Sequence, residues 1–239
     1  MSLVLITGGA KRLGKGLAVE FAKNGWDVGF CYNKSENESE TTLNELLQYD
    51  ISVNKFKCDV TNYQDVETKF KVFFDKYGKP DVLINNAGVY PQAKSLTETT
   101  PELWKFVIDS NLTSQFNTAK VYSELTETGR IVNIGSLGAF EIWNGRIPYN
   151  VSKAAVIQLT KALARELAPR FSVNCVCPGE IKMDESGPDE SWSLPNEKIP
   201  MNRKAYVEDI FDAVYFFSNE SKYITGQYLI IDGGYHLAR

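Results

Sequence analysis

Tyr149 and Lys153 are the side chains in this 239-residue sequence whose types and spacing point most directly to chemistry. They are four residues apart in a segment with helical periodicity, so both side chains lie on one face of the expected helix. A free tyrosine has a pKa of about 10, and a neighbouring ammonium stabilises the phenolate and lowers that pKa. Such a tyrosine can transfer a proton to a carbonyl oxygen as a general acid.

A second chemically informative stretch is the glycine-rich turn TGGAKRLGKG at 7–16, which follows the apolar run LVLI. Backbone N–H groups at a helix N-terminus bind phosphate, and glycines let the backbone approach it closely. Gly8, Gly14 and Gly16 supply that freedom, whereas Arg12 stands where such turns often carry glycine. The turn predicts a dinucleotide phosphate site in which Arg12 serves the cofactor, the substrate or both.

The elements that must position these residues alternate between short apolar runs and longer amphipathic runs. This alternation predicts a parallel sheet covered on both faces, with ligands bound beyond the carboxyl ends of the strands. We expect strands in 3–6, 27–32, 52–60, 81–88, 130–136, 172–179 and 227–234, and helices in 13–25, 38–49, 62–78, 101–128, 149–168 and 207–218. The predicted fold class is α/β, a single doubly wound Rossmann-type domain over 1–239 with about seven parallel strands.

Composition excludes several function classes. The net charge of −4 gives no indication of nucleic-acid or membrane binding, and no apolar run approaches the ~20 residues of a membrane span. The start of the chain lacks the basic region of a signal peptide, so we expect a cytoplasmic protein. The four cysteines fit no zinc spacing and are expected to be buried, and His236 is the only histidine, so we predict no metal site. The irregular segment 183–201 is expected to be a surface loop that covers or binds the substrate.

Several motifs, in order along the chain, resemble those of the short-chain dehydrogenase/reductase family. The turn T-G-x-x-x-R-x-G is similar to the family's T-G-x-x-x-G-x-G, and DV at 59–60, NNAG at 85–88, YNVSK at 149–153, PGEI at 178–181 and ITGQYLIIDGG at 224–234 also match. The resemblance covers essentially the whole chain. It implies a cofactor site formed by Thr7, Gly8, Leu13, Gly14, Asp59, Val60, Asn86, Ala87, Gly88, Tyr149, Lys153, Pro178, Gly179 and Ile181.

The same resemblance implies a catalytic tetrad of Asn111, Ser136, Tyr149 and Lys153. A serine at the position of Ser136 hydrogen-bonds the reacting carbonyl in the family, and an asparagine at the position of Asn111 holds a water near the lysine for proton relay. Met183 departs from the pattern, because the family often has a threonine there whose hydroxyl contacts the nicotinamide. A thioether donates no hydrogen bond, so we expect looser cofactor orientation without loss of activity.

The expected cofactor is NADP(H). Sites that prefer NAD usually end the second strand with an acidic residue that binds the ribose 2′-hydroxyl, but here no carboxylate occurs before Glu36. We expect the 2′-phosphate to lie at the end of the second strand, beside Tyr32, Asn33, Lys34 and Ser35. Lys11 and Arg12 in the first turn add positive charge nearby. Each charge-assisted contact contributes ~1.5–3 kcal/mol, so a few set the preference.

The substrate is less sharply indicated. Ser136 resembles the family's carbonyl reductases, among them 3-oxoacyl-(acyl carrier protein) reductases, whereas the arginine turn resembles pteridine reductases, which commonly carry aspartate at the position of Ser136. An NADPH-dependent reductase of 3-oxoacyl thioesters is the leading expectation, with pteridine reduction and a non-catalytic NADP-binding sensor or scaffold as alternatives. Arg130 and Arg170 are either contacts for an acidic carrier or ordinary solvated arginines. Family members usually pair through long helices, so we expect a homotetramer or homodimer formed through 101–128 and 149–169.

Overall fold

The computed structural model describes residues 2–183 and 194–238. Its seven strands are all parallel and form one sheet in the order β3-β2-β1-β4-β5-β6-β7, which confirms the predicted fold class. The strands are β1 (Leu3–Thr7), β2 (Asp27–Tyr32), β3 (Val53–Lys57), β4 (Val82–Asn85), β5 (Gly129–Ile134), β6 (Phe171–Pro178) and β7 (Tyr228–Ile231). Strand order runs outward in both directions from β1 and β4, which creates the switch point where such sheets bind ligands.

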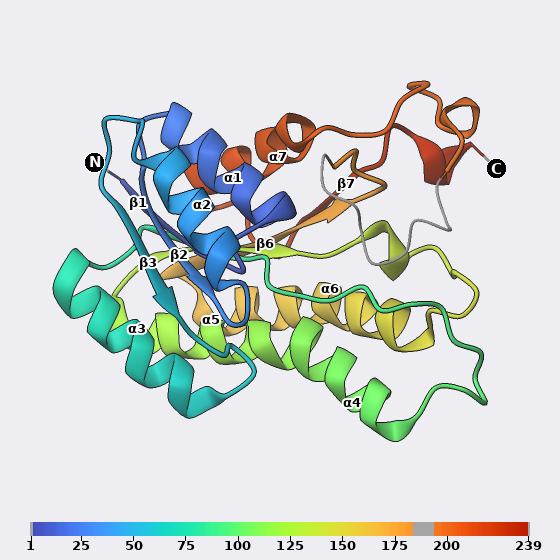
Figure 1. Cartoon of the computed structure of the whole chain (residues 1–239), viewed down its shortest axis with the longest axis horizontal. Helices are drawn as coiled ribbons and strands as arrows, with labels where there is room; N and C mark the ends of the chain where they lie inside the picture. The colour runs from blue at the N-terminus through green and yellow to red at the C-terminus, as the bar shows by residue number, and fades with distance from the viewer. Residues whose placement is uncertain (1, 184–193, 239) are drawn as a thin grey trace.

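Helices cover both faces of the sheet (Figure 1). On one face lie α1 (Arg12–Lys23), α2 (Glu36–Leu46) and α7 (Val207–Asn219). On the other lie α3 (Tyr63–Tyr77), α4 (Pro101–Ile108), α5 (Ser114–Leu125) and α6 (Ile147–Leu167). None of the helices within the described ranges combines the length and the apolar character needed to cross a membrane.

The strands are apolar on both faces because both faces are covered. Val4 and Ile6 of β1 belong to the apolar cluster that includes α1 and α7, whereas Leu5 belongs to the cluster that includes α3 and α5. All three side chains are fully buried. Such strands appear in a sequence as continuous apolar runs instead of an alternating pattern. The four cysteines are buried and unpaired, as expected.

Several helix boundaries differ from the sequence-based expectation. Helix α2 spans Glu36–Leu46 where the pattern predicted 38–49, and α6 begins at Ile147, with Pro148 in its first turn, where Tyr149 was expected. Proline suits the first helical turn because the missing N–H has no partner there in any helix. The helical region 101–128 is interrupted by the π-helical segment Asp109–Thr113, which separates α4 from α5.

Of the expected loop at 183–201, residues 184–193 lie outside the described residues. The described end, 194–201, is not a plain surface loop. Leu194 and Ile199 are buried, at 8% and 4% exposure, and Asn196–Lys198 forms a short 3-10 turn. A Cβ on Gly233 would lie 2.7 Å from the Ile199 side chain, so this end packs tightly against the C-terminal turn.

Candidate active site

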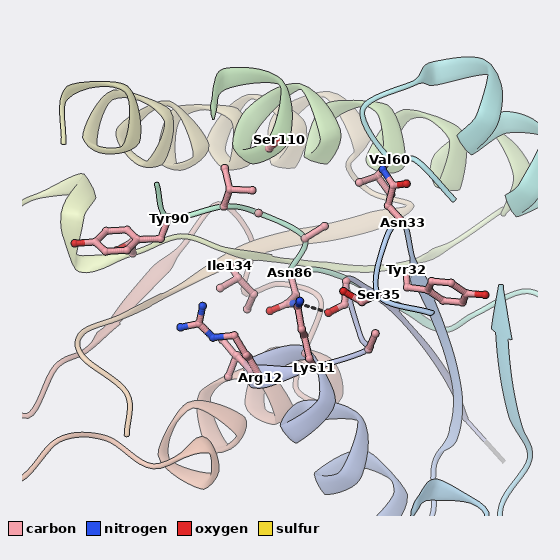
Figure 2. Close-up of a pocket in the computed structure, with 18 of the residues that line it drawn as sticks. Lys11, Arg12, Tyr32, Asn33, Ser35, Val60, Asn86, Tyr90, Ser110 and Ile134 are labelled. Atoms are coloured by element: carbon pink, nitrogen blue, oxygen red, sulfur yellow. Dashed lines mark hydrogen bonds between the residues drawn. The ribbon is translucent and has the colours of Figure 1, made fainter. Parts of the chain in front are cut away.

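A pocket of about 710 Å³ opens beyond the carboxyl ends of the strands, at the switch point. Its walls come from the segments that follow β1 to β6, so residues far apart in the sequence meet there (Figure 2). The predicted cofactor residues that line it are Gly8, Lys11, Arg12, Leu13, Gly14, Tyr32, Asn33, Lys34, Ser35, Asp59, Val60, Asn86, Ala87, Gly88, Tyr149, Lys153, Pro178, Gly179 and Ile181. Ligand pockets typically have volumes of ~300–1,000 Å³, so the size suits a bound cofactor.

The turn after β1 brings the backbone close to a ligand. Gly8 has a φ of +65°, a left-handed conformation that glycine adopts without a steric penalty. A Cβ on Gly14 would lie 2.2 Å from the Gly8 carbonyl oxygen and 2.5 Å from Asn86 Nδ2, so no larger residue fits. Asn86 Nδ2 donates hydrogen bonds to the carbonyl oxygens of Thr7 and Gly8, at 2.9 and 3.1 Å. These contacts hold the turn against the segment that follows β4.

Arg12 occupies a strained position in this turn. Its φ is +51°, which is rare for a residue with a side chain. The guanidinium makes no hydrogen bond or ion pair with the described residues and extends toward the end of the pocket that holds Tyr90 (Figure 2). It therefore points away from Tyr32 and Ser35, at the end where the 2′-phosphate was expected. Strained residues concentrate at functional sites, which favours a ligand-binding role for Arg12.

Thr7 was predicted to bind the cofactor, but it is not among the residues that line the pocket. Its side chain is buried, and Oγ1 accepts hydrogen bonds from the N–H groups of Asn86 and Ala87, both at 3.0 Å. Oγ1 also donates to the Ile84 carbonyl oxygen at 3.4 Å. Thr7 therefore joins the end of β1 to the loop after β4. These contacts give Thr7 a positioning role in the pocket wall, and its contact with a cofactor stays a prediction.

Lys153 is buried and Tyr149 is half-buried at the catalytic end of the pocket, and desolvation is the largest influence on the pKa of each. Burial raises the pKa of Tyr149 to about 12, which the hydrogen bond with Ser136 opposes only in part. Burial also lowers the pKa of Lys153 to about 8. Lys153 Nζ donates to the Ile134 carbonyl oxygen at 2.9 Å and lies 5.9 Å from the centre of the Tyr149 ring. The predicted lowering of the Tyr149 pKa by Lys153 is not seen here, because desolvation of the phenolate is the largest influence on that pKa.

Ser136 lies just beyond β5, where it caps the short 3-10 turn Leu137–Ala139. Its Oγ accepts a hydrogen bond from the Gly138 N–H at 3.0 Å. Because the backbone already donates to the oxygen, the hydroxyl proton can be directed at a ligand oxygen. The side chain is 6% exposed and lines the same pocket as Tyr149. The fold thus brings together two residues that are thirteen positions apart in the sequence.

Asn111 sits in the π-helical segment between α4 and α5. Its side chain is fully buried and holds the loop after β4: Oδ1 accepts from the Val89 N–H at 2.7 Å, and Nδ2 donates to the Val89 carbonyl oxygen at 3.1 Å. Nδ2 also donates to Ser152 Oγ at 3.1 Å. Asn111 is not among the lining residues, although a Cβ on the lining residue Gly88 would lie 2.9 Å from its Oδ1. π-Helical turns are frequent at functional sites.

The opposite end of the pocket is formed by the N-terminus of α2. Asn33, Lys34 and Ser35 line the pocket there, and the Ser35 side chain makes no capping hydrogen bond. The N–H groups of the first helical turn are therefore available to an anion. Tyr32 also borders the pocket, but its ring points away from the other labelled residues (Figure 2), and its hydroxyl donates to Glu36 Oε1 at 2.6 Å.

Comparison with known proteins identifies the family. A family model described as "Enoyl-(Acyl carrier protein) reductase" matches residues 8–236. The chain is 32% identical over 240 residues to the 3-oxoacyl-(acyl-carrier-protein) reductase FabG of Staphylococcus epidermidis, and the match covers 98% of each chain. The protein belongs to the short-chain dehydrogenase/reductase family. It is therefore an oxidoreductase that acts on a carbonyl or alcohol group.

Solved structures of this short-chain dehydrogenase/reductase family share the fold over nearly the whole chain. A short chain dehydrogenase from Burkholderia cenocepacia in complex with NADP is 28% identical, with a TM-score of 0.90 over 98% of both chains. A variant of the actinorhodin polyketide ketoreductase with NADPH is 30% identical, with a TM-score of 0.89, and the match covers 98% of this chain and 97% of that one.

The family's P-G motif is followed here by a glutamate that fastens the base of the 183–201 segment. Glu180 Oε1 lies 2.6 Å from Lys204 Nζ, and Oε2 accepts a hydrogen bond from the Leu194 N–H at 2.6 Å. A parallel bridge between Ile181 and Ala205 closes the same base. Met183, at the position of the family's usual threonine, lines the pocket.

Several lining residues were missed by the sequence analysis: Tyr90, Phe106, Asp109, Ser110, Ile134 and Gly135. Ile134 and Gly135 stand at the carboxyl end of β5, so the rule that ligands bind beyond strand ends could have found them. Phe106 in α4 and Asp109 and Ser110 in the π-helical segment do not follow a strand, so that rule could not have predicted them. Tyr90 packs edge-to-face on the Tyr149 ring, with centroids 4.8 Å apart, and only the fold makes this visible.

Two arginines that were considered for carrier-protein binding lie elsewhere. Arg130 is at the start of β5, paired with Val82 at the start of β4, and Arg170 immediately precedes β6. Both therefore occupy the amino edge of the parallel sheet, opposite the pocket. Arg130 also donates to the Asn219 and Glu220 carbonyl oxygens, at 3.4 and 3.1 Å. Strand direction thus places both arginines at the edge of the sheet far from the pocket, and their contact with an acidic carrier stays a prediction.

Proposed function

We propose that this protein is an NADPH-dependent carbonyl reductase in which Tyr149 is the general acid. The observation that carries the proposal is the convergence of Ser136, Tyr149 and Lys153 at one end of a pocket whose other end is an uncapped helix N-terminus. A non-catalytic NADP sensor has no need of this arrangement of proton donors.

The residues at the pocket fit NADP(H). The Gly8–Gly14 cradle admits no Cβ, and α1 carries no acidic residue in its first turn, so the positive end of its dipole suits a pyrophosphate. Asn33, Lys34 and Ser35 at the start of α2 would hold a 2′-phosphate. Solved relatives with NADP or NADPH support the same cofactor.

The chain's own groups account for the proton transfer. NADPH, when bound, supplies the hydride that reduces the substrate carbonyl. The Ser136 hydroxyl donates to the carbonyl oxygen, and one such donor typically contributes ~2.7–4 kcal/mol to the transition state. Tyr149, protonated at neutral pH because its pKa is about 12, transfers its phenolic proton to that oxygen. Lys153, charged below its pKa of about 8, stabilises the phenolate that remains.

Reduction needs the protonated phenol and oxidation needs the phenolate, so the raised pKa of Tyr149 keeps it at neutral pH in the form that reduction uses. Asn111 keeps the loop after β4 in place through Val89, and we propose that it also holds the relay water near Lys153.

We propose 3-oxoacyl thioesters as the leading substrate class. The support is the serine at position 136 together with 32% identity to a relative whose name is 3-oxoacyl-(acyl-carrier-protein) reductase. The segment near 183–201, fastened by Glu180, is proposed to contact the substrate.

Pteridine reduction is the second candidate, and Arg12 is the observation that favours it. The guanidinium extends toward Tyr90, at the catalytic end of the pocket, where it could meet a polar heterocycle (Figure 2). Ser136 argues against this candidate, because pteridine reductases commonly carry aspartate at that position.

A homodimer or homotetramer is proposed as the assembled form. Trp104 and Phe106 of α4 and Phe116 of α5 are 40%, 51% and 45% exposed. These exposed apolar side chains lie on the helices through which pairing is predicted, which supports the proposal. Sedimentation analysis of the purified protein tests the proposal, and a monomer at micromolar concentration would reject it.

The function is tested by following NADPH oxidation with acetoacetyl thioesters, dihydropterins, quinones and simple ketones. Turnover of the thioester supports the leading proposal, turnover confined to pterins selects the second candidate, and tight NADPH binding without turnover selects the sensor. Tyr149→Phe keeps the ring and removes the proton, so it should lower kcat/KM by ~10²–10⁴-fold. Undiminished activity of this variant would refute the mechanism.

A further inference from the structure

Glu36 places a carboxylate next to the proposed 2′-phosphate site. It is the first residue of α2 and directly follows Ser35, which lines the pocket. Its side chain is 57% exposed. An acidic residue near the end of the second strand is the feature that selects NAD, because it accepts hydrogen bonds from the ribose and repels a phosphate. A preference for NADP therefore requires that this carboxylate be restrained and neutralised.

Tyr32 and Lys55 provide that restraint. The Tyr32 hydroxyl donates to Glu36 Oε1 at 2.6 Å, and Lys55 Nζ lies 3.8 Å from the same oxygen. Lys55 Nζ also lies 2.6 Å from Glu40 Oε1, donates to Ser39 Oγ at 2.8 Å, and lies 5.0 Å from the centre of the Tyr32 ring. The Lys55 side chain is only 12% exposed, whereas Glu36 and Glu40 are 57% and 56% exposed, so water screens these two ion pairs in part.

The surrounding charges leave one lysine available for a phosphate. Glu38, the other acidic residue in the first turn of α2, lies 3.5 Å from Lys11. Lys34 makes no ion pair or side-chain hydrogen bond with any described residue. With Glu36 and Glu40 held by Lys55, and Glu38 by Lys11, the positive charge of Lys34 is not cancelled by the acidic side of α2.

We infer that Lys55 and Tyr32 are specificity-determining residues, which select the 2′-phosphate of NADP(H) indirectly by holding the Glu36 carboxylate away from it. The inference rests on the proposed NADP(H)-dependent function. Neither residue needs to touch the phosphate. Without Lys55, the negative charges of Glu36 and Glu40 oppose a phosphate at Lys34 and Ser35, and Glu36 becomes able to accept hydrogen bonds from an unphosphorylated ribose.

The test measures binding of 2′,5′-ADP and 5′-AMP by isothermal titration calorimetry, which reads the 2′-phosphate directly and needs no turnover. The wild-type protein should prefer 2′,5′-ADP. The preference is expressed as the dissociation constant of 5′-AMP divided by that of 2′,5′-ADP. Lys55→Met should reduce this ratio by about tenfold, because the charge that neutralises Glu36 is lost. Lys55→Met combined with Glu36→Gln should restore most of the preference, because the repelling charge is then absent.

Lys71→Met is the matched control, since it removes an ion-paired lysine from α3 and should leave the ratio unchanged. Tyr32→Phe removes only the restraining hydroxyl and should lower the ratio in the same direction, which keeps the test valid if Lys55→Met unfolds. A wild-type protein that binds both nucleotides equally refutes the proposed NADP preference. A wild-type preference that survives Lys55→Met, or a loss that Glu36→Gln fails to restore, overturns the inference alone.

Discussion

Replacing Arg12 by glycine should make the protein more stable and its cofactor site weaker. Arg12 holds a φ of +51°, and its guanidinium makes no hydrogen bond or ion pair with the described residues. The structure therefore shows a backbone cost at this position and no compensating hydrogen bond or ion pair among the described residues. A ligand contact would explain why arginine is present where glycine fits without strain.

The magnitude follows from two opposing effects. A left-handed backbone costs a residue with a Cβ roughly 1–2 kcal/mol, which glycine avoids. Glycine also gives the unfolded chain more freedom, which lowers stability by about 0.4–1 kcal/mol. The strain term is the larger, so Arg12→Gly should raise the free energy of unfolding by about 0.5–1 kcal/mol. In a chain of 239 residues, 1 kcal/mol corresponds to roughly 2–4 °C in Tm.

Thermal denaturation and NADPH titration of the same sample test both halves of this prediction. The Tm should rise by about 1–4 °C. The dissociation constant of NADPH, or the KM of the carbonyl substrate, should rise by ~10-fold or more, the worth of one charge-assisted contact. Arg12→Ala is the control, because it loses the guanidinium and keeps the strain. It should show the weaker binding without the gain in Tm. A fall in Tm for Arg12→Gly, or unchanged binding and turnover, would refute the reasoning.

Three further predictions concern the pocket. Because Lys153 titrates at about 8, kcat/KM for NADPH, which reports the free enzyme, should fall as pH rises through 8. A pH profile that stays flat to pH 9.5 would contradict this. Gly14→Ala forces a Cβ to within 2.2 Å of the Gly8 carbonyl oxygen, so NADPH affinity should fall ~10-fold or more, whereas Gly16→Ala, which clashes with Val207 instead, should lower only the Tm. Equal NADPH affinity in the two variants would count against the cradle. Met183→Thr restores a hydroxyl at the pocket wall and should lower the dissociation constant of NADPH by ~2–10-fold. Calorimetry showing weaker binding would reject that role.

Local spacing along the chain was sufficient to predict the architecture and much of the pocket. Alternating apolar and amphipathic runs correspond to the seven parallel strands and their covering helices. In a parallel sheet all carboxyl ends meet at one edge, so motifs that follow strands must converge there. Gly8, Asn86 and Gly179, which the family resemblance assigned to one cofactor site, line one pocket for this reason.

Other properties were decided only by tertiary contacts. The four-residue spacing of Tyr149 and Lys153 placed them on one helix face, but the pKa of Tyr149 rises because surrounding segments exclude water from it. The Thr7 hydroxyl accepts hydrogen bonds from the N–H groups of Asn86 and Ala87, nearly eighty residues away in the sequence. No local sequence pattern predicts these contacts. Glu36 is the first carboxylate after the second strand, and only the fold brings Lys55, from the neighbouring strand, to within 3.8 Å of it.

The sequence by itself predicted the fold class and the family, because these depend on periodicity and on motif order along the chain, and the proposed catalytic set followed from the family resemblance. The tertiary structure decided which side chains reach the pocket, how they titrate and which charges are neutralised. Those properties depend on burial and on distances between segments that are remote in the sequence, and the sequence does not encode them in any local pattern. Arg12 depends on both sources. Its position in the motif is read from the sequence, whereas its left-handed backbone, which points to a ligand-binding role, is seen only in the structure.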